Sequence, residues 1–292
     1  MEKRKTPSKR LLVVGTGTMG RGIAQAAATA GWTVHLHDAK PGVAGQCIEK
    51  ISESLERSIG RSWLAADQLR PTLERLLPAS NLRIAGEVDV VLEAIWEELT
   101  LKQNLFRELE EIVDEKTFFW TNTSMLSVTG IAAPLRHPER LVGTHFFNPV
   151  PRMKLVEVIA GRATSPDAVV AAENDLRQWG KTTVRAPDSP GFIVNRIFDV
   201  IKREALMLLQ EGVPAAEIDR AVKLGLNFPM GPFEVMDLVG LDTTLACLKT
   251  QASRTGSSDA PGTALEELVR RGDLGRKSGS GFYSYPPRRA AS

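Results

Sequence analysis

The chain has 292 residues, 42% of them hydrophobic and 25% charged, a composition typical of a globular protein with one large domain or two smaller ones. A net charge of +2 gives no support for a nucleic-acid or anionic-membrane surface, and the sequence contains neither a membrane-spanning apolar run nor a secretion signal, so we expect a soluble cytoplasmic protein. The two cysteines, Cys47 and Cys247, have no paired or metal-ligand spacing, so neither a disulfide nor a bound metal is expected.

The first motif is a glycine-rich turn between a predicted strand at residues 10–14 and a predicted alanine-rich helix at residues 22–28. In such a turn the first glycine permits a tight bend, the second lets the backbone approach a pyrophosphate, and the third lets the helix pack on the strand. The motif therefore predicts a dinucleotide-binding unit. The residues of the turn are Gly15, Thr16, Gly17, Thr18, Met19 and Gly20.

A second predicted strand, Thr33–His37, is followed by Asp38, which lies 18 residues beyond Gly20. An acidic side chain at this spacing bonds the adenosine ribose of a dinucleotide, and it repels the 2′-phosphate of NADP. We therefore predict that the cofactor is NAD, although Lys40 lies close by. The alternative for Asp38 is a helix cap before Pro41.

The segment up to residue 121 alternates between helical and strand patterns. This alternation predicts a parallel, doubly wound α/β sheet of the Rossmann type, whose ligands bind at the carboxyl ends of the strands. The predicted helices span residues 43–59, 65–77 and 98–113, and the predicted strands span residues 88–94 and 117–121.

A histidine and a glutamate then follow, twelve residues apart in the chain. His145 can accept and return a proton near neutral pH, and Glu157 could orient its ring. Predicted strands at residues 140–146 and 154–159 are joined by an Asn-Pro-Val-Pro segment that cannot continue a helix, so the two side chains could meet across a turn. The alternative is a strand-end histidine with a surface glutamate.

The character of the chain changes near residue 188, because no convincing strand follows the predicted helix at 166–179 and strand at 182–186. Ser189 is expected to cap a long helix that has Pro190 at its first position and ends near residue 211. We predict a Rossmann-like NAD-binding domain of residues 1–187 and an all-helical domain of residues 188–292. Further helices are predicted at residues 214–224, 232–249 and 262–271, with a loop at 250–262 and a loose tail at 1–8.

Seven segments in this order resemble the 3-hydroxyacyl-CoA dehydrogenase family, most closely its short 3-hydroxybutyryl-CoA dehydrogenase members. The resemblance extends from about Lys9 to Tyr285. It implies reversible oxidation of the L-3-hydroxyl of an acyl-CoA to a ketone, with the hydride passing to NAD. The segments are the glycine turn, the run that contains His145, and residues 93–97, 122–124, 190–196, 229–233 and 275–283.

The resemblance also implies roles for individual side chains. His145 would be the base, and Glu157 would hold its ring and stabilise its charged form. Ser124 and Asn195 would bond oxygen atoms of the substrate. The alternatives are a helix cap before residues 127–132 for Ser124, and satisfaction of interdomain backbone groups for Asn195.

Four further residues match family positions. Glu97 and Lys102 would lie near the nicotinamide ribose, although from local spacing Lys102 could equally form a surface ion pair with Glu98. Asn148 would contribute to the substrate pocket or merely form an Asn-Pro turn, and Lys277 would contact substrate or lie in a solvated turn.

The sequence departs from the family between residues 45 and 63. Members often carry a lysine-rich helix here that approaches the CoA phosphates, whereas this chain has only scattered basic residues before Ser62 and Trp63. A substrate carried by an acyl carrier protein therefore stays open, as does the acyl chain length. We also expect a homodimer through the helical domain, because residues 229–241 and the helices around them carry more apolar side chains than a domain of this size can bury.

Three other functions stay open. Dehydrogenases of free 3-hydroxy acids share the turn that ends in Met-Gly, but they use a catalytic lysine in the helical domain. A gulonate-type sugar-acid dehydrogenase would keep the histidine. A non-catalytic role, as in relatives that became lens crystallins, would not require Ser124, His145, Glu157 and Asn195 together.

Overall fold

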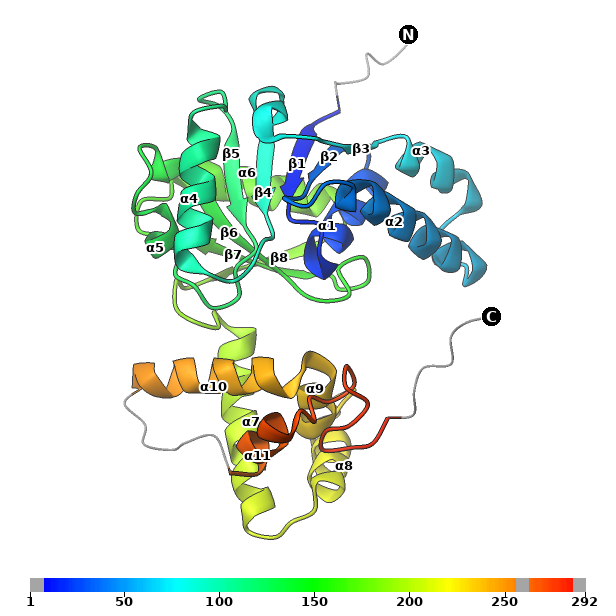
Figure 1. Ribbon diagram of the computed structural model, residues 1–292, viewed down its shortest axis with the longest axis vertical. Helices are drawn as coiled ribbons and strands as arrows, with labels where there is room; N and C mark the ends of the chain where they lie inside the picture. The colour runs from blue at the N-terminus through cyan, green and yellow to red at the C-terminus, as the bar shows by residue number, and fades with distance from the viewer. Residues whose placement is uncertain (1–7, 256–262, 286–292) are drawn as a thin grey trace. The chain divides into compact units, whose positions relative to one another are not determined.

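The computed structural model, drawn in Figure 1, describes residues 8–255 and 263–285. The chain divides into two compact units, and the division falls between Phe192 and Ile193. The first unit is built on an eight-stranded sheet, and the second is helical.

Strands and helices alternate along the first unit. The strands are β1 (Arg10–Val14), β2 (Thr33–His37), β3 (Leu76–Pro78), β4 (Val90–Glu93), β5 (Phe118–Thr121), β6 (Leu141–Phe146), β7 (Leu155–Ala160) and β8 (Thr182–Ala186). The α-helices are α1 (Thr18–Thr29), α2 (Val43–Gly60), α3 (Leu69–Leu73), α4 (Leu99–Glu110), α5 (Val128–Ala132) and α6 (Pro166–Gln178). The short 3₁₀ helices are η1 (Ala66–Gln68), η2 (Leu82–Glu87) and η3 (Pro138–Arg140).

The strand order is β3-β2-β1-β4-β5-β6-β7-β8. All neighbouring strands are parallel except β6 and β7, which are antiparallel. The chain moves outward in one direction from β1 to β3 and then returns to place β4 on the other side of β1. This reversal of order makes the carboxyl ends of β1 and β4 the expected binding edge of a doubly wound sheet.

Helices cover both faces of the sheet. Helices α1, α2 and α6 pack on one face, where Ile23, Ile51 and Leu176 join the strand residues in one apolar core. Helices α4 and α5 cover the other face, and the rings of Phe106 and Phe119 lie 5.2 Å apart there. Because both faces are covered, the central strands are almost continuously apolar, as their sequence pattern requires.

The second unit consists of α7 (Val194–Gln210), α8 (Ala215–Leu226), α9 (Pro232–Val239), α10 (Leu241–Thr255) and α11 (Thr263–Arg271). Its core centres on Phe233, Met236 and Leu241. The buried carboxylate of Asp237 accepts hydrogen bonds from the amides of Phe282 and Tyr283, which fastens the segment after α11 to α9. Within the described part of the chain, no helix has the length and apolar character needed to cross a bilayer.

The helix predicted at residues 65–77 is wrong in its second half. Only η1 and α3 are helical, and Leu76–Pro78 forms β3 at the edge of the sheet. A strand of three residues shows too little alternation to be distinguished from the end of a helix. Proline is compatible with this strand because an edge position leaves its missing N–H without consequence.

Two predicted helix boundaries are also wrong, each because of backbone with positive φ. The first helix of the second unit begins at Val194 and not at Pro190, since Gly191 (φ 80°) and Phe192 (φ 48°) are left-handed. The helix predicted at 232–249 is two helices, α9 and α10, separated at Gly240 (φ 108°). Helix α10 extends into the predicted loop, whose remainder, 256–262, lies outside the described residues, as does the tail at 1–7.

Candidate functional site

The glycine turn follows β1 at the binding edge of the sheet. The amide of Gly15 (φ 93°) donates to the carbonyl of His37 at 2.9 Å, which ties the turn to the end of β2. A Cβ on Gly20 would lie 1.8 Å from the carbonyl oxygen of Gly15, so only glycine fits there. A Cβ on Gly17 would meet no described atom within 4 Å, so the outer side of the turn is open to a ligand.

Helix α1 begins at Thr18, directly after this open position, with Met19 in its first turn. Its N-cap is Gly17, and among the described residues no side chain bonds the amides of the first turn and no acidic residue lies in it. Free amides at the positive end of a helix dipole favour an anion. The uncapped helix and the open space beside Gly17 therefore fit the pyrophosphate of NAD.

Asp38 lies at the end of β2 beside the turn. Its Oδ2 accepts from the amide (3.0 Å) and hydroxyl (2.8 Å) of Thr16, and its Oδ1 accepts from the amide of Lys40 (3.2 Å). Burial raises the pKa of Asp38, but these hydrogen bonds outweigh it and hold the pKa below its ordinary value. The alternative of a helix cap is wrong, because Gly42 is the N-cap of α2. An ionised carboxylate here fits a ribose hydroxyl and disfavours a 2′-phosphate.

His145 and Glu157 are direct cross-strand partners in the antiparallel pair β6–β7. Nδ1 of the ring lies 2.7 Å from Oε2 of the carboxylate, and the two residues are 4% and 0% exposed. The predicted contact is therefore present, and the alternative of a surface glutamate is wrong. Because a carboxylate only accepts hydrogen bonds, Nδ1 donates and Nε2 is left as the proton acceptor.

The surroundings of His145 are aromatic on two sides and polar at Nε2. The ring centroids of Phe147 and Phe192 lie 4.6 Å and 5.4 Å from that of the imidazole. The hydroxyl oxygen of Ser124 lies 3.1 Å from Nε2. The alternative role of Ser124 as a helix cap is wrong, because Ser127 caps α5 by accepting from the amide of Gly130.

Glu97 organises the loop that carries Ser124. Its Oε1 accepts from the hydroxyl of Thr123 (2.6 Å) and from the amides of Ser124 (2.8 Å) and Met125 (2.9 Å). Burial raises the pKa of Glu97, but the Lys102 ammonium group and these hydrogen bonds hold it below its ordinary value. Glu97 is thus an ionised group at the carboxyl edge of the sheet, and its side chain is 37% exposed.

Lys102 has different partners from those predicted. Its side chain is 1% exposed, and its Nζ lies 2.5 Å from Oε1 of Glu93 and 3.3 Å from Oε2 of Glu97. The predicted surface pair with Glu98 is therefore wrong, and the ammonium group lies instead between the carboxylates of Glu93 and Glu97. Glu93 was not predicted from the sequence, where its one signal is a charged residue at the end of an apolar strand.

The other three predicted substrate residues are outside this hydrogen-bonded group. Asn148 is exposed in the loop between β6 and β7. Asn195 is the second residue of α7, and Lys277 forms an ion pair with Asp242 at 2.5 Å, both within the second unit. The structure thus brings together His145, Glu157, Ser124 and Glu97, with Lys102 behind them.

Lys181 is a second residue that sequence analysis missed. Its side chain is almost fully buried, and its Nζ donates to the carbonyls of Val150 (2.5 Å) and Met153 (2.9 Å). Burial lowers the pKa of Lys181. The contact fastens the loop that carries Asn148 to the start of β8. A lone lysine before a strand gives no sequence signal for this role.

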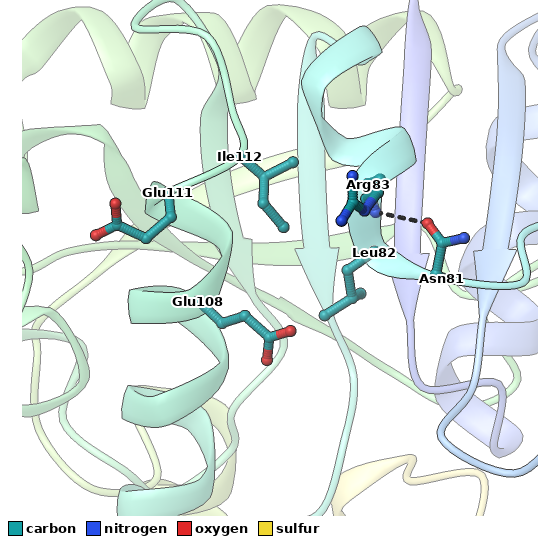
Figure 2. Close-up of a pocket in the computed structure, with 6 residues that line it drawn as sticks. All are labelled: Asn81, Leu82, Arg83, Glu108, Glu111 and Ile112. Carbon is teal, nitrogen blue, oxygen red and sulfur yellow. Dashed lines mark hydrogen bonds between the residues drawn. The ribbon is translucent and has the colours of Figure 1, made fainter.

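A cavity of about 630 Å³ lies elsewhere and is shown in Figure 2. Its walls belong to the segment before β4 and the end of α4, so it lies at the amino-terminal edge of the sheet. The hydrogen bond drawn there joins the amide of Arg83 to the side chain of Asn81, which caps η2. This cavity and the buried titratable groups therefore lie in different places, and the chemistry of the groups locates the site. The cavity is lined by Asn81, Leu82, Arg83, Glu108, Glu111 and Ile112.

Comparison with known proteins finds matches to one protein family over both units. Residues 10–189 match the 3-hydroxyacyl-CoA dehydrogenase NAD binding domain, and residues 191–285 match the C-terminal domain of that family. The chain is 42% identical over 282 residues to the 3-hydroxyadipyl-CoA dehydrogenase of Escherichia coli K12, which covers 96% of this chain and 59% of that protein. It is 38% identical to the 3-hydroxybutyryl-CoA dehydrogenase of Clostridioides difficile, over 94% of this chain and 99% of that one.

A solved structure agrees with these matches. The crystal structure of (S)-3-hydroxybutyryl-CoA dehydrogenase from Ralstonia eutropha has a TM-score of 0.91 and 37% identity, covering 96% of this chain and 99% of its own. Both the sheet with its NAD-binding turn and the helical unit are therefore shared with enzymes of one kind. The chain belongs to the 3-hydroxyacyl-CoA dehydrogenase family.

Proposed function

We propose that the protein catalyses the reversible, NAD-dependent oxidation of an L-3-hydroxyacyl-CoA to the 3-ketoacyl-CoA, with 3-hydroxybutyryl-CoA as its main substrate. The observation that carries the proposal is the buried His145–Glu157 pair, with Ser124 on the free ring nitrogen. The names of the relatives at 38% and 42% identity support the acyl-CoA class over free hydroxy acids or gulonate. The reaction is one step of fatty acid metabolism.

The proton chemistry follows from the geometry of His145. Bound NAD supplies the hydride acceptor. Nε2 accepts the substrate hydroxyl proton, while Glu157 fixes the tautomer through Nδ1 and stabilises the positive charge that the ring gains. A positioned base of this kind contributes about 10²–10⁴-fold. Ser124 bonds the reacting oxygen and holds it within reach of Nε2.

The remaining contacts are assigned on the same basis. Gly15, Gly17, Thr18, Met19 and Gly20 bind the pyrophosphate through backbone amides, and Asp38 binds the adenosine ribose. Glu97 is the ionised, partly exposed group assigned to the nicotinamide ribose. Asn195, Asn148 and Lys277 are assigned to the substrate.

An exposed tryptophan supports CoA over an acyl carrier protein. The guanidinium carbons of Arg152 and Arg61 lie 4.5 Å and 4.9 Å from the centroid of the Trp63 ring, which is 54% exposed. Trp63 and Arg152 also line a cavity of about 520 Å³ beside α1 and α2. An aromatic ring with two cations suits a phosphorylated nucleotide such as the adenosine end of CoA.

We further propose a homodimer that forms through the second unit. Large apolar side chains there are exposed, and Leu224 reaches 80%. Exposed apolar side chains of this kind are typical of a subunit interface. A cytoplasmic location is proposed because NAD and acyl-CoA are intracellular metabolites. Other exposed apolar side chains of the second unit include Ile197, Val200, Leu226, Leu238 and Val239.

The deciding experiment is the NADH-linked reduction of acetoacetyl-CoA by the purified protein. We expect turnover with acetoacetyl-CoA and NADH, and little or none with acetoacetate and NADH or with gulonate and NAD. Acetoacetyl-acyl carrier protein, tested at the same concentration, separates the two carriers. No turnover with any of them, from a protein that binds NADH in a fluorescence titration, would refute the proposal in favour of a non-catalytic role. Light scattering at micromolar concentration tests the dimer, which a monomer mass would contradict.

A further inference from the structure

A chain of buried ionic groups lies directly behind the Ser124 loop. We propose that Glu93 is a positioning residue, which acts through Lys102 and Glu97 to hold Ser124 against His145. The kinetic part of this inference rests on the proposed function, whereas its structural part does not.

The first of these ionic groups is Glu93, the last residue of β4, whose side chain is fully buried. Its Oε1 accepts from the amide of Ile95 (2.8 Å) and from Lys102, and its Oε2 accepts from the hydroxyl of Thr121 (2.6 Å). Thr121 is the register partner of Glu93 in the parallel pair β4–β5. The position of this carboxylate is therefore fixed by the pairing of two central strands.

Lys102 transmits that position to Glu97. It projects from α4, and its Nζ contacts the carboxylates of both Glu93 and Glu97. An ammonium group that is 1% exposed needs a compensating charge, because burial without one is very costly. Glu93 supplies that charge from the sheet, so Lys102 is held in place without drawing Glu97 inward.

Glu97 then fixes the loop. One carboxylate oxygen accepts three hydrogen bonds from residues 123–125, including the amide of Ser124 itself. The hydroxyl of Thr123 also accepts from the amide of Leu126 at 3.0 Å, which closes the turn. The last link is the 3.1 Å contact between the Ser124 hydroxyl and Nε2 of His145. Every step from β4 to the proposed base is thus a direct contact.

A purely stabilising role explains this arrangement less well. Buried ion pairs are often no more stabilising than apolar side chains of similar size, so stability alone does not call for one. The series of ionic contacts ends at the amides of Ser124 and Met125, which set the direction of the Ser124 side chain. A positioning role accounts for both the charges and the place where they end.

The structural test is amide hydrogen exchange in Glu93→Gln. We expect the Ser124 and Met125 amides to exchange about tenfold faster than in the wild type, since local opening sets their exchange rate. The control is Glu110→Gln. Glu110, at the end of α4, is buried like Glu93, but its carboxylate accepts from the amides of Arg136 and His137. The control should leave exchange at Ser124 and Met125 unchanged.

A milder variant keeps the test usable if Glu93→Gln does not fold. Thr121→Val preserves shape and removes one donor to Glu93, so we expect exchange at the same two amides to rise about threefold. Unchanged exchange at Ser124 and Met125 in the folded variants would overturn the proposal. So would an equal rise in the Glu110→Gln control.

The kinetic test is a double-mutant cycle with acetoacetyl-CoA. Glu93→Gln should lower kcat about tenfold when Ser124 is present and less than about twofold in a Ser124→Ala background, because the two changes act on one interaction. Equal losses in both backgrounds, or a loss confined to NADH affinity, would overturn the proposal. If the wild type lacks activity but exchange responds as expected, the proposed function fails while the positioning of Ser124 stands.

Discussion

The substitution Glu157→Gln tests the two proposed roles of the buried carboxylate, which are to fix the tautomer of His145 and to stabilise its positive charge. Glutamine has nearly the same size, so the packing between β6 and β7 is kept while the negative charge is lost. The amide can also present its NH₂ group to Nδ1 of His145, which would leave the proton on Nε2 and remove the acceptor. Turnover should fall because the charge is lost and because the tautomer changes. The glycine turn that is proposed to bind the cofactor is untouched.

The size of the loss can be worked from the observed geometry. The hydrogen-bonded atoms lie 2.7 Å apart, and the charge on the imidazolium is spread over the ring, so the charges are effectively about 4 Å apart. At an effective dielectric constant of about 20 this gives about 4 kcal/mol. At about 1.4 kcal/mol per decade, that energy corresponds to a loss of about 10³-fold in kcat. Selection of the wrong tautomer can extend the loss toward about 10⁴-fold.

The assay is steady-state reduction of acetoacetyl-CoA followed by NADH absorbance, with NADH affinity measured separately by fluorescence. We expect the dissociation constant for NADH to stay within about twofold, since the proposed cofactor contacts come from the glycine turn and Asp38. Glu173→Gln is the matched control, because Glu173 is a buried glutamate of the same unit whose partners are Arg185 and Arg177. A loss below about tenfold in folded Glu157→Gln would refute the dyad, because charge and tautomer would then not matter.

Three further predictions concern the cofactor site. Gly17→Ala should fold with a normal Tm yet bind NADH at least about tenfold more weakly, because its Cβ enters the space assigned to the pyrophosphate. Gly20→Ala should lower both the Tm and the affinity for NADH, because its Cβ would overlap the carbonyl oxygen of Gly15. Asp38→Ser should narrow the preference for NADH over NADPH in kcat/KM, and an unchanged ratio would remove Asp38 from ribose recognition. The lowered pKa of Glu97 means that its stabilising contribution is complete above its ordinary value of 4.5 and is lost as the pH falls toward the lower folded value. Over that pH range the free energy of unfolding should therefore fall less for Glu97→Gln than for the wild type. Parallel plots of unfolding free energy against pH for the two proteins would contradict this.

Much of the first unit was predictable because its elements carry strong local signals. The glycine turn, the apolar runs of β1 and β4 and the periodicity of α4 each follow from short stretches of sequence. The errors came from backbone states that side-chain patterns do not encode. Phe192 adopts a positive φ that its residue type disfavours, and β3 is a strand because it pairs with β2 rather than because of its own composition.

The candidate site was predictable where motif spacing and strand register coincide. His145 and Glu157 were paired correctly because an antiparallel turn brings residues at that spacing opposite each other. Lys102 was harder, because i,i+4 spacing indicates Glu98, whereas burial selects partners from β4 and its following loop. Long-range partners such as Glu93 depend on packing between elements, which no local window contains.

The register of β6 and β7 has a consequence for how this enzyme can evolve. The pairing of His145 with Glu157 is set by the strand register, and moving either strand by one residue would turn one side chain to the opposite face of the sheet. The intervening loop, residues 147–154, has no part in that pairing and is fastened instead by Lys181. Substitutions in this loop therefore leave the opposed positions of His145 and Glu157 unchanged.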